Sequence, residues 1–168
     1  MRLIDFYTLI KSDINLIGGN TFVKKLLSMC FNMQLRLILN YRLGNYLHLN
    51  RNFVYSIIIM YLKRRQISSY GCDISYFSKI GKHIRLPHPL GITIGSGCEI
   101  GDNVMIWQNV TLGSLGNKEK KYPKLKNGVK IYTNSVIVGD IVIGKNSVIG
   151  AMSFVNKSIK ANTIFYGR

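Results

Sequence analysis

The stretch IGSGCEIGDNVMIWQNVT, from Ile94 to Thr111, places an aliphatic residue at every sixth position. The same rhythm returns in IVGDIVIGKNSVIGAMSF, from Ile137 to Phe154. The fifth position of each unit is usually small or branched, and glycine, asparagine or aspartate recurs between the aliphatic positions. An α-helix cannot keep a period of six on one face, because its 3.6-residue turn carries the apolar positions around the axis. The pattern therefore predicts short flat strands, separated by tight turns and stacked as a solenoid.

The six-residue units extend outward from these two stretches and are broken twice. They begin at Ile74, Ile80, Leu86, Ile94, Ile100, Ile106, Leu112, Leu125, Ile131, Ile137, Ile143, Ile149 and Val155. The first break adds two residues around His88, which lies between Pro87 and Pro89. The second break carries the charged run KEKKYP, which cannot enter a core, so we expect residues 113–124 to form a protruding loop. The faces of a solenoid are regular and repetitive, so we expect a catalytic or binding site where a residue or loop departs from the repeat. Both breaks are therefore candidate functional positions.

Residues 1–70 have a helical periodicity instead. In residues 21–47 the apolar side chains recur at three-to-four spacing, and Asn20-Thr21 precedes them as a predicted helix cap. Residues 53–65 form a second apolar segment that ends in the cations Lys63 to Arg65, which suit the last turn of a helix. We therefore expect a basic helical region over residues 1–70, followed by the solenoid domain over residues 71–168.

The net charge restricts the partners more than the fold. Lys and Arg number 23 against 7 Asp and Glu, which gives +16 over 168 residues, and the two predicted regions carry +8 each. Such a charge favours anionic partners. Because no nucleic-acid-binding signature accompanies it, we expect no nucleic acid partner. A basic nucleic-acid-binding protein stays only as a remote alternative.

Two interpretations stay open for the apolar helical segments: packing on their own protein, or contact with a membrane surface. The longest apolar run, Phe53 to Leu62, has ten residues, whereas a membrane span needs about 20. The first fifteen residues contain no cleavable signal pattern. The sequence thus predicts a cytoplasmic protein, with contact to the inner face of the membrane as the second possibility.

The cysteines and histidines do not form a metal-binding pattern. Cys30, Cys72 and Cys98 are odd in number and lack CxxC spacing, which argues against a disulfide framework or a zinc knuckle. Cys72 and Cys98 are best explained as small core residues. A histidine pair five residues apart, at 83 and 88, resembles a β-helix zinc site, but the third histidine lies at 48 in the helical region. We therefore expect no metal, and a metal-dependent β-helix enzyme is a remote alternative.

At this point two long stretches carry a specific resemblance. CDISYFSKIGKHIRLPHPLGITIGSGCEIGDNVMIWQNVTLGS (72–114) and YPKLKNGVKIYTNSVIVGDIVIGKNSVIGAMSFV (122–155) resemble the catalytic domain of serine acetyltransferases. They look equally similar to relatives in polysaccharide gene clusters that acetylate sugar hydroxyls. The resemblance covers residues 71–167. It implies a mainly β protein, a left-handed parallel β-helix preceded by helices, with acetyl-CoA as co-substrate and a homotrimeric assembly.

The resemblance also assigns catalytic roles to two residues. It implies that His88 is the general base and that Asp73, fifteen residues earlier, orients its imidazole. A hydroxyl has too high a pKa to attack a thioester unaided, and a neutral imidazole can take its proton as the attack proceeds. A carboxylate on the other ring nitrogen fixes the tautomer and stabilises the imidazolium. The two flanking prolines restrict the backbone that carries the ring.

The acceptor-binding positions depart from the family pattern. Serine acetyltransferases usually have an acid where this chain has Pro87, and Arg-His-Pro-Lys where this chain has Lys121-Tyr122-Pro123-Lys124. Their acidic helical domain is replaced here by basic, apolar helices. We therefore expect acetylation of a sugar hydroxyl in cell-surface polysaccharide biosynthesis, with Lys121 and Tyr122 contacting the acceptor. Serine O-acetylation, a step in cysteine biosynthesis, is the alternative.

For the donor, the resemblance implies a groove between neighbouring subunits. Backbone near Gly139 and Ala151 would contact the pantetheine arm, and Gly113 would allow backbone to approach the ligand closely. Lys157, with the loop lysines at 120 and 121, would meet the phosphates as point charges. Family members continue past the final FYGR with Pro-Ala-Arg or Pro-Ala-Lys, so two interpretations stay open: weaker coenzyme A binding, or a sequence shortened at this end.

Overall fold

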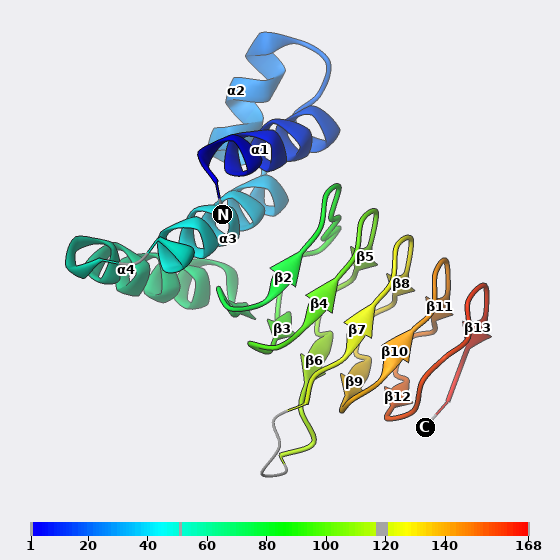
Figure 1. Cartoon of the computed structure of the whole chain (residues 1–168). Coiled ribbons are helices and arrows are strands. Elements are labelled where there is room, and N and C mark those ends of the chain that lie inside the picture. The colour runs from blue at the N-terminus through cyan, green and yellow to red at the C-terminus, as the bar shows by residue number, and fades with distance from the viewer. Residues whose placement is uncertain (1, 51, 117–120, 168) are drawn as a thin grey trace.

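The computed structural model describes residues 2–50, 52–116 and 121–167, and it consists of four helices followed by a β-solenoid (Figure 1). The helices are α1 (Leu3–Ile17), α2 (Phe22–Phe31), α3 (Met33–Leu49) and α4 (Phe53–Tyr70). The strands of the first two coils are β1 (Asp73–Ile74), β2 (Lys79–Ile80), β3 (Thr93–Ile94), β4 (Glu99–Ile100) and β5 (Met105–Ile106). The later strands are β6 (Thr111–Gly113), β7 (Lys124–Leu125), β8 (Lys130–Ile131), β9 (Val136–Val138), β10 (Val142–Ile143), β11 (Val148–Ile149), β12 (Phe154–Val155) and β13 (Ile164–Phe165).

The strands form three parallel sheets that wind around one core. Sheet A has the order β1-β3-β6-β9-β12, the second sheet β10-β7-β4-β2, and the third β13-β11-β8-β5. Successive strands along the chain therefore belong to different sheets, and the coil closes when the chain returns to sheet A. This arrangement confirms the predicted left-handed β-helix of hexapeptide repeats preceded by helices. The strand register also locates the first break, because Asp73 pairs with Thr93, 20 residues on, whereas Thr93 pairs with Thr111, 18 residues on.

The core confirms the two predicted positions of each unit. At the first position, Ile94, Ile106 and Ile131 are fully buried, and at the fifth position Val104 and Ser135 are fully buried as well. Asparagines occupy equivalent tight turns between the strands. Asn103, Asn109, Asn134 and Asn146 all have φ of 57° or 58° there. Asparagine tolerates this left-handed conformation better than most residues, so it turns the chain at little steric cost.

The helices differ from the prediction at two places. The apolar stretch 21–47 is two helices, because Asn32 takes an extended backbone and its side chain accepts a hydrogen bond from the Leu35 N–H, which starts α3 anew. The prediction that the cations at 63–65 occupy the last turn is wrong. Helix α4 continues to Tyr70 and ends at Gly71, whose φ of 59° is the left-handed conformation of a helix stop. The predicted cap is confirmed, since the Thr21 side chain accepts from the Lys24 N–H.

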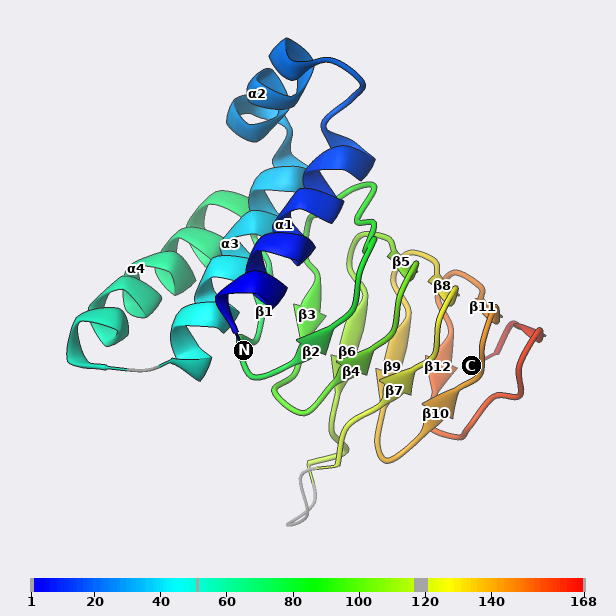
Figure 2. The same cartoon turned by 45° about the horizontal axis from the view of Figure 1, so that its top comes forward.

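The helices pack at the first-coil end of the solenoid (Figure 2). Arg42 of α3 is the main link: its Nη1 and Nη2 each donate to a backbone carbonyl, those of Ile80 and Gly81, at 2.6 Å. Its Nε donates to Asp13 of α1 at 2.9 Å, and both side chains of this ion pair are buried. One guanidinium therefore joins two helices to the first coil.

Candidate active site

His88 lies on the irregular turn that the first break creates. The turn follows Arg85, which bridges to Met105 of the third sheet, and leads into β3 of sheet A. His88 is exposed, and its backbone carbonyl accepts from the Leu90 N–H at 2.8 Å. The break therefore presents an imidazole on the outside of an otherwise regular wall.

The same turn is held against the residues that precede β1. The Cys72 thiol donates to the Pro89 carbonyl at 3.3 Å, and the Gly91 N–H donates to the Gly71 carbonyl at 3.2 Å. The core role predicted for Cys72 is confirmed, because the side chain is buried and burial raises the pKa of its thiol. The backbone around His88 is thus fixed relative to the start of β1.

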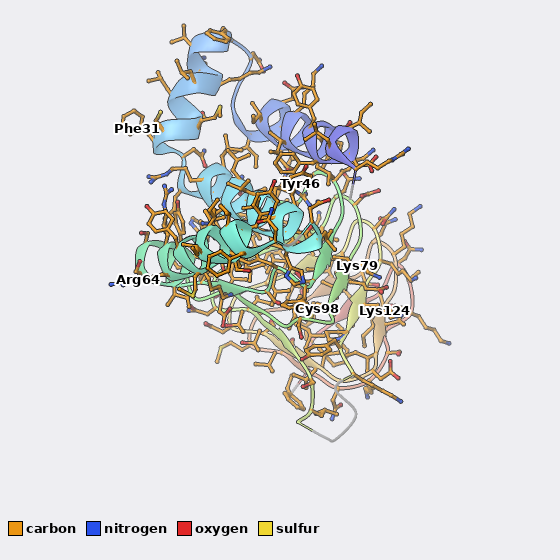
Figure 3. The ribbon with its side chains drawn as sticks, turned by 60° about the vertical axis from the view of Figure 1, so that its left-hand side comes forward. Phe31, Tyr46, Arg64, Lys79, Cys98 and Lys124 are labelled. Carbon is orange, nitrogen blue, oxygen red and sulfur yellow. The ribbon has the colours of Figure 1, made fainter. Side chains whose placement is uncertain are left out.

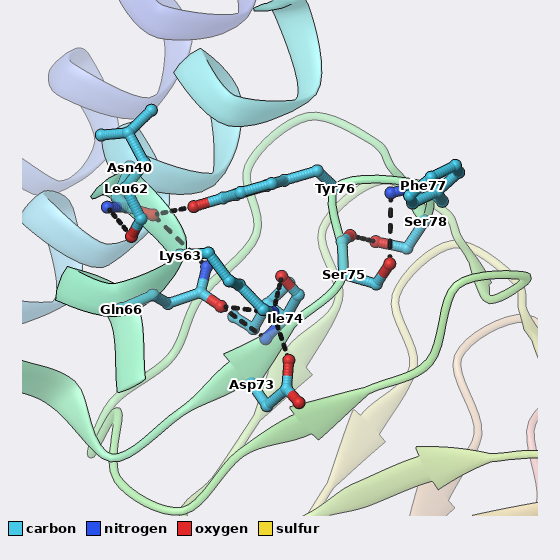
Figure 4. Close-up of polar contacts among 10 residues, drawn as sticks. All are labelled: Asn40, Leu62, Lys63, Gln66, Asp73, Ile74, Ser75, Tyr76, Phe77 and Ser78. Atoms are coloured by element: carbon cyan, nitrogen blue, oxygen red, sulfur yellow. Dashed lines mark hydrogen bonds and ion pairs between the residues drawn. The ribbon is translucent and has the colours of Figure 1, made fainter. Parts of the chain in front are cut away.

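Asp73 is the first residue of β1, so it lies at the end of sheet A that the His88 turn enters. Its carboxylate is exposed, and Oδ1 accepts a hydrogen bond from Lys63 Nζ of α4 (Figure 4). No hydrogen bond joins the Asp73 carboxylate to the His88 ring among the described residues. The fold therefore brings the two predicted residues into the same coil but gives Asp73 a different partner from the one that the resemblance implies.

Lys63 belongs to a network of polar side chains under the first coil. Its Nζ also donates to Gln66 Oε1 at 3.3 Å and to the Ile74 carbonyl at 3.2 Å. Gln66 Oε1 in turn accepts from the Ile74 N–H at 2.8 Å, and its Nε2 donates to Asn40 Oδ1 at 3.4 Å. Figure 4 shows this network between α4 and β1.

Sequence reasoning missed Lys63, Gln66 and Asn40. Lys63 was interpreted as part of a cationic helix end, and the two amides were not singled out. The available signal was modest: Gln66 and Asn40 are polar residues within apolar helical segments, and Gln66 lies three residues after Lys63. Side chains at that spacing share one helix face. Buried polar groups need partners, so an amide on an apolar helix face is the kind of residue that indicates a polar contact with another element.

A cavity of about 450 Å³ lies between the helices and the first coil. It is lined by His48, Ser56, Ile59, Met60, Lys63, Ser75, Tyr76 and Phe77. The His48 and Phe77 rings are in contact, with centroids 3.8 Å apart, and form one aromatic wall. Lys63 lines this cavity and also contacts Asp73, so its side chain connects the cavity to the Asp73 carboxylate.

The predicted acceptor residues of the loop lie at another corner of the solenoid. We call the described turns between sheet A and the second sheet (75–78, 95–98, 114–116 with 121–123, 139–141 and 156–158) the loop corner. Tyr122 is partly buried there, and its hydroxyl accepts from Ser96 Oγ at 3.1 Å. Lys121 is exposed and pairs with Asp140, with 3.5 Å between Nζ and Oδ2. Lys120 lies outside the described residues.

The predicted donor residues divide between two corners. Gly113, Gly139 and Lys157 lie at the loop corner, in or just after β6, β9 and β12. Ala151 lies instead in the row of turns between the third sheet and sheet A (86–92, 107–110, 132–135 and 150–153), which we call the His88 corner. Hydrogen bonds between successive turns connect this row, so Ala151 is three turns beyond the His88 turn, about 14 Å along the axis. Within one chain, the predicted site residues therefore lie at opposite ends of the strands of sheet A.

The backbone is open to close approach at Gly113, whereas a Cβ added at Gly139 would meet the Leu115 side chain at 3.0 Å. A Cβ added at Gly113 would meet only Val138 Cγ1, at 3.8 Å, which is ordinary contact. Gly139 has a φ of 100°, a conformation that favours glycine. In the described part of the chain, no group of three or more His, Cys, Asp or Glu side chains is arranged to hold a metal ion.

Comparison with known proteins agrees with this architecture. Residues 122–157 match the family model described as bacterial transferase hexapeptide (six repeats). Serine acetyltransferase of Staphylococcus epidermidis is 37% identical over 134 residues, which cover 79% of this chain and 62% of that relative. Serine acetyltransferase of Staphylococcus aureus is 39% identical over 105 residues, which cover 61% and 49% of the two chains.

Solved structures give the same result for nearly the whole chain. The crystal structure of serine acetyltransferase from Brucella abortus superposes with a TM-score of 0.83 at 27% identity, covering 96% of this chain and 66% of that one. The serine acetyltransferase of Neisseria gonorrhoeae also gives 0.83, at 26% identity, covering 97% and 63%. By fold and by sequence, the chain is similar to serine acetyltransferases, and it contains hexapeptide repeats of the bacterial transferase type. It spans less than two thirds of the length of each of these relatives.

Proposed function

We propose that the chain transfers an acetyl group from acetyl-CoA to an acceptor hydroxyl, with His88 as the general base. The observation that carries this proposal is the first break in the repeat, which exposes His88 in the turn before β3, the strand that pairs with the strand of Asp73, in a fold shared with proteins named serine acetyltransferase. His88 takes the hydroxyl proton while the oxygen attacks the thioester carbonyl. The imidazolium then returns that proton to the departing thiolate, so the products are an acetyl ester and coenzyme A.

Serine is the first acceptor to test. The relatives are named serine acetyltransferase, and this favours serine over the sugar hydroxyl that the sequence analysis preferred. The sugar stays a second candidate for one structural reason. The cavity of about 450 Å³ is much larger than a serine molecule, and its His48–Phe77 wall is of the kind on which a sugar ring packs.

The acceptor experiment measures release of the coenzyme A thiol from acetyl-CoA with L-serine and with a panel of monosaccharides and nucleotide sugars. Turnover with serine alone would assign the chain to serine acetylation. Turnover with a sugar and not with serine would support the second candidate. Absence of release above the rate of spontaneous hydrolysis with every acceptor would contradict the proposed function.

A trimer is supported by the division of the site residues between two corners. The loop corner of one subunit, with Gly139 and Lys157, would face the His88 corner of its neighbour. Acetyl-CoA would then lie in the groove between subunits, where its phosphates meet Lys157 and its pantetheine arm follows the backbone near Gly139 and Ala151. Within one chain the strands of sheet A lie between the two corners, which favours a site completed by a second subunit.

We also infer contact with an anionic membrane surface through α2. This helix has no buried side chain, and Phe22 and Phe31 at its ends are 80% and 79% exposed. Figure 3 shows Phe31 and Arg64 of α4 projecting away from the solenoid. Lys24 and Lys25 of α2 add positive charge beside the apolar side chains, as in helices that lie on membranes. Among the described residues, no helix is long and apolar enough to cross a bilayer.

Cosedimentation with vesicles tests this contact. We expect binding to phosphatidylglycerol vesicles, little binding to phosphatidylcholine vesicles, and loss of binding in the double variant Phe22→Ser, Phe31→Ser. Ile164→Ser, which removes an exposed apolar residue at the other end of the solenoid, serves as the control. Unchanged vesicle binding by the double variant would contradict a membrane role. A wild type that does not bind vesicles, with a double variant that changes only its assembly state, would contradict it as well.

A further inference from the structure

We propose that Lys63 is a positioning residue for Asp73, a role that rests on the proposed acetyl transfer. Lys63 approaches from α4 and holds one carboxylate oxygen of Asp73, which leaves the other oxygen for the imidazole of His88. The orientation of the catalytic carboxylate is thereby set by a helix that precedes the solenoid.

The ammonium group of Lys63 has its full complement of acceptors. A lysine side chain has three N–H donors, and Lys63 has three acceptors within hydrogen-bond distance, on Gln66, Asp73 and Ile74. It also lies 5.6 Å from the centre of the Tyr76 ring. The side chain is 31% exposed. A cation with all of its donors used is suited to hold a neighbouring group in place and is poorly suited to bind a substrate anion.

Strand β1 needs such an attachment because it lies at the edge of sheet A. It has two residues, Asp73 and Ile74, and pairs with β3 on one side only. Short edge strands are among the least protected parts of a sheet. Helix α4 supplies the missing contacts, since Gln66 accepts from the Ile74 N–H and Lys63 donates to the Ile74 carbonyl. The residue after Asp73 is therefore held through both of its backbone polar groups.

The position of Lys63 is itself fixed by buried groups. Gln66 is fully buried and donates to Asn40 of α3, and Asn40 Oδ1 also accepts from the Tyr76 hydroxyl at 2.8 Å. Burial, with a smaller contribution from the charge of Asp73, raises the pKa of the Tyr76 hydroxyl, so it remains a donor at every pH that the protein meets. Asn40 Nδ2 completes the network by donating to the Leu62 carbonyl at 3.1 Å.

The catalytic consequence follows from orientation. A carboxylate that rotates freely offers its oxygen to the imidazole only part of the time, and small errors in position cost large factors in rate. Lys63→Met keeps most of the side-chain length and removes all three donors. We expect kcat to fall about tenfold or more with KM for acetyl-CoA unchanged, because Lys63 is not among the residues of the proposed donor groove. Lys63→Arg, which keeps charge and donors, should recover most of the lost kcat.

A double-variant cycle separates positioning from a general structural role. In an Asp73→Asn background, the carboxylate is already absent, so adding Lys63→Met should leave kcat unchanged. Lys79→Met is the matched control, because Lys79 pairs with Glu99 on the second sheet at 3.2 Å and should leave kcat at the wild-type value. Thermal melts of each variant check that the comparison concerns folded protein.

Three outcomes would overturn the proposal. Lys63→Met could turn over at the wild-type rate, or it could lower kcat equally with and without the Asp73 carboxylate; either result removes the positioning role while the acetyl transfer stands. Absence of transfer by the wild type with every acceptor would overturn the proposed function, and the role of Lys63 with it.

Discussion

At the scale of single residues, Tyr122 shows how the solenoid prepares the loop corner. Its ring lies over the turn that contains Gly95 and Gly97, and a Cβ at either position would come within 2.5 Å of a ring carbon. These two glycines therefore make room for the ring, and the Ser96 hydroxyl bonds its phenol. The loop is anchored where it rejoins the wall.

The thiols give a direct residue-scale prediction. Cys98 is fully buried, and burial raises the pKa of its thiol to about 12, so it stays neutral and unreactive at pH 8. Cys72 is buried with a raised thiol pKa as well, whereas Cys30 is exposed. We expect a chromogenic disulfide reagent to titrate one thiol rapidly in the folded protein and three in guanidinium chloride. Rapid reaction of all three without denaturant would contradict the described core.

At the scale of elements, the buried ion pair between Asp13 and Arg42 joins the helices to the first coil. Breaking a buried pair leaves an uncompensated charge, so Asp13→Ala should lower the free energy of unfolding by about 3–5 kcal/mol. Asp5→Ala is the control, because its pair with Arg2 is exposed and should contribute less than about 1 kcal/mol. Urea unfolding followed by circular dichroism measures both. Equal effects of the two substitutions would show that Asp13 does not link the elements.

The elements also show what the sequence could predict. The solenoid was predictable because the residue types within each six-residue unit indicate which of its positions are buried. Ile94, at a first position, and Val104, at a fifth position, are examples. The exposed His88 and its coil were predictable for the same reason, because they interrupt that pattern. The partner of Asp73 was not predictable. It depends on how α4 packs across β1, and a period within Phe53–Tyr70 does not encode that contact.

Helix α2 also shows a limit of prediction from apolar periodicity. The apolar spacing of Phe22, Leu26 and Leu27 predicted a helix, and the helix forms, but these side chains are exposed. Periodicity identifies which residues share a face, and it does not identify what covers that face.

At the scale of the whole molecule, the separation of the two corners predicts an assembly. Three chains of 19.1 kDa should elute as a species of about 57 kDa when size-exclusion chromatography is coupled to light scattering.

A mixed trimer is the sharper test. Subunits carrying His88→Ala and subunits carrying a blocked loop corner, Gly139→Trp, should regain activity when refolded together, because one groove then combines two intact corners. An active monomer would contradict a site shared between subunits.

The measurement that tests the central claim most directly compares acetyl-CoA turnover by the wild type and by His88→Ala with the acceptor that the panel identifies. We expect kcat to fall by about 10²- to 10⁴-fold with an unchanged melting temperature, because His88 is exposed and, in the proposed mechanism, its imidazole removes the acceptor proton. His83→Asn, in the same coil, keeps the left-handed backbone at φ 57° and should retain activity. Wild-type turnover by folded His88→Ala would contradict general-base catalysis at this break in the repeat.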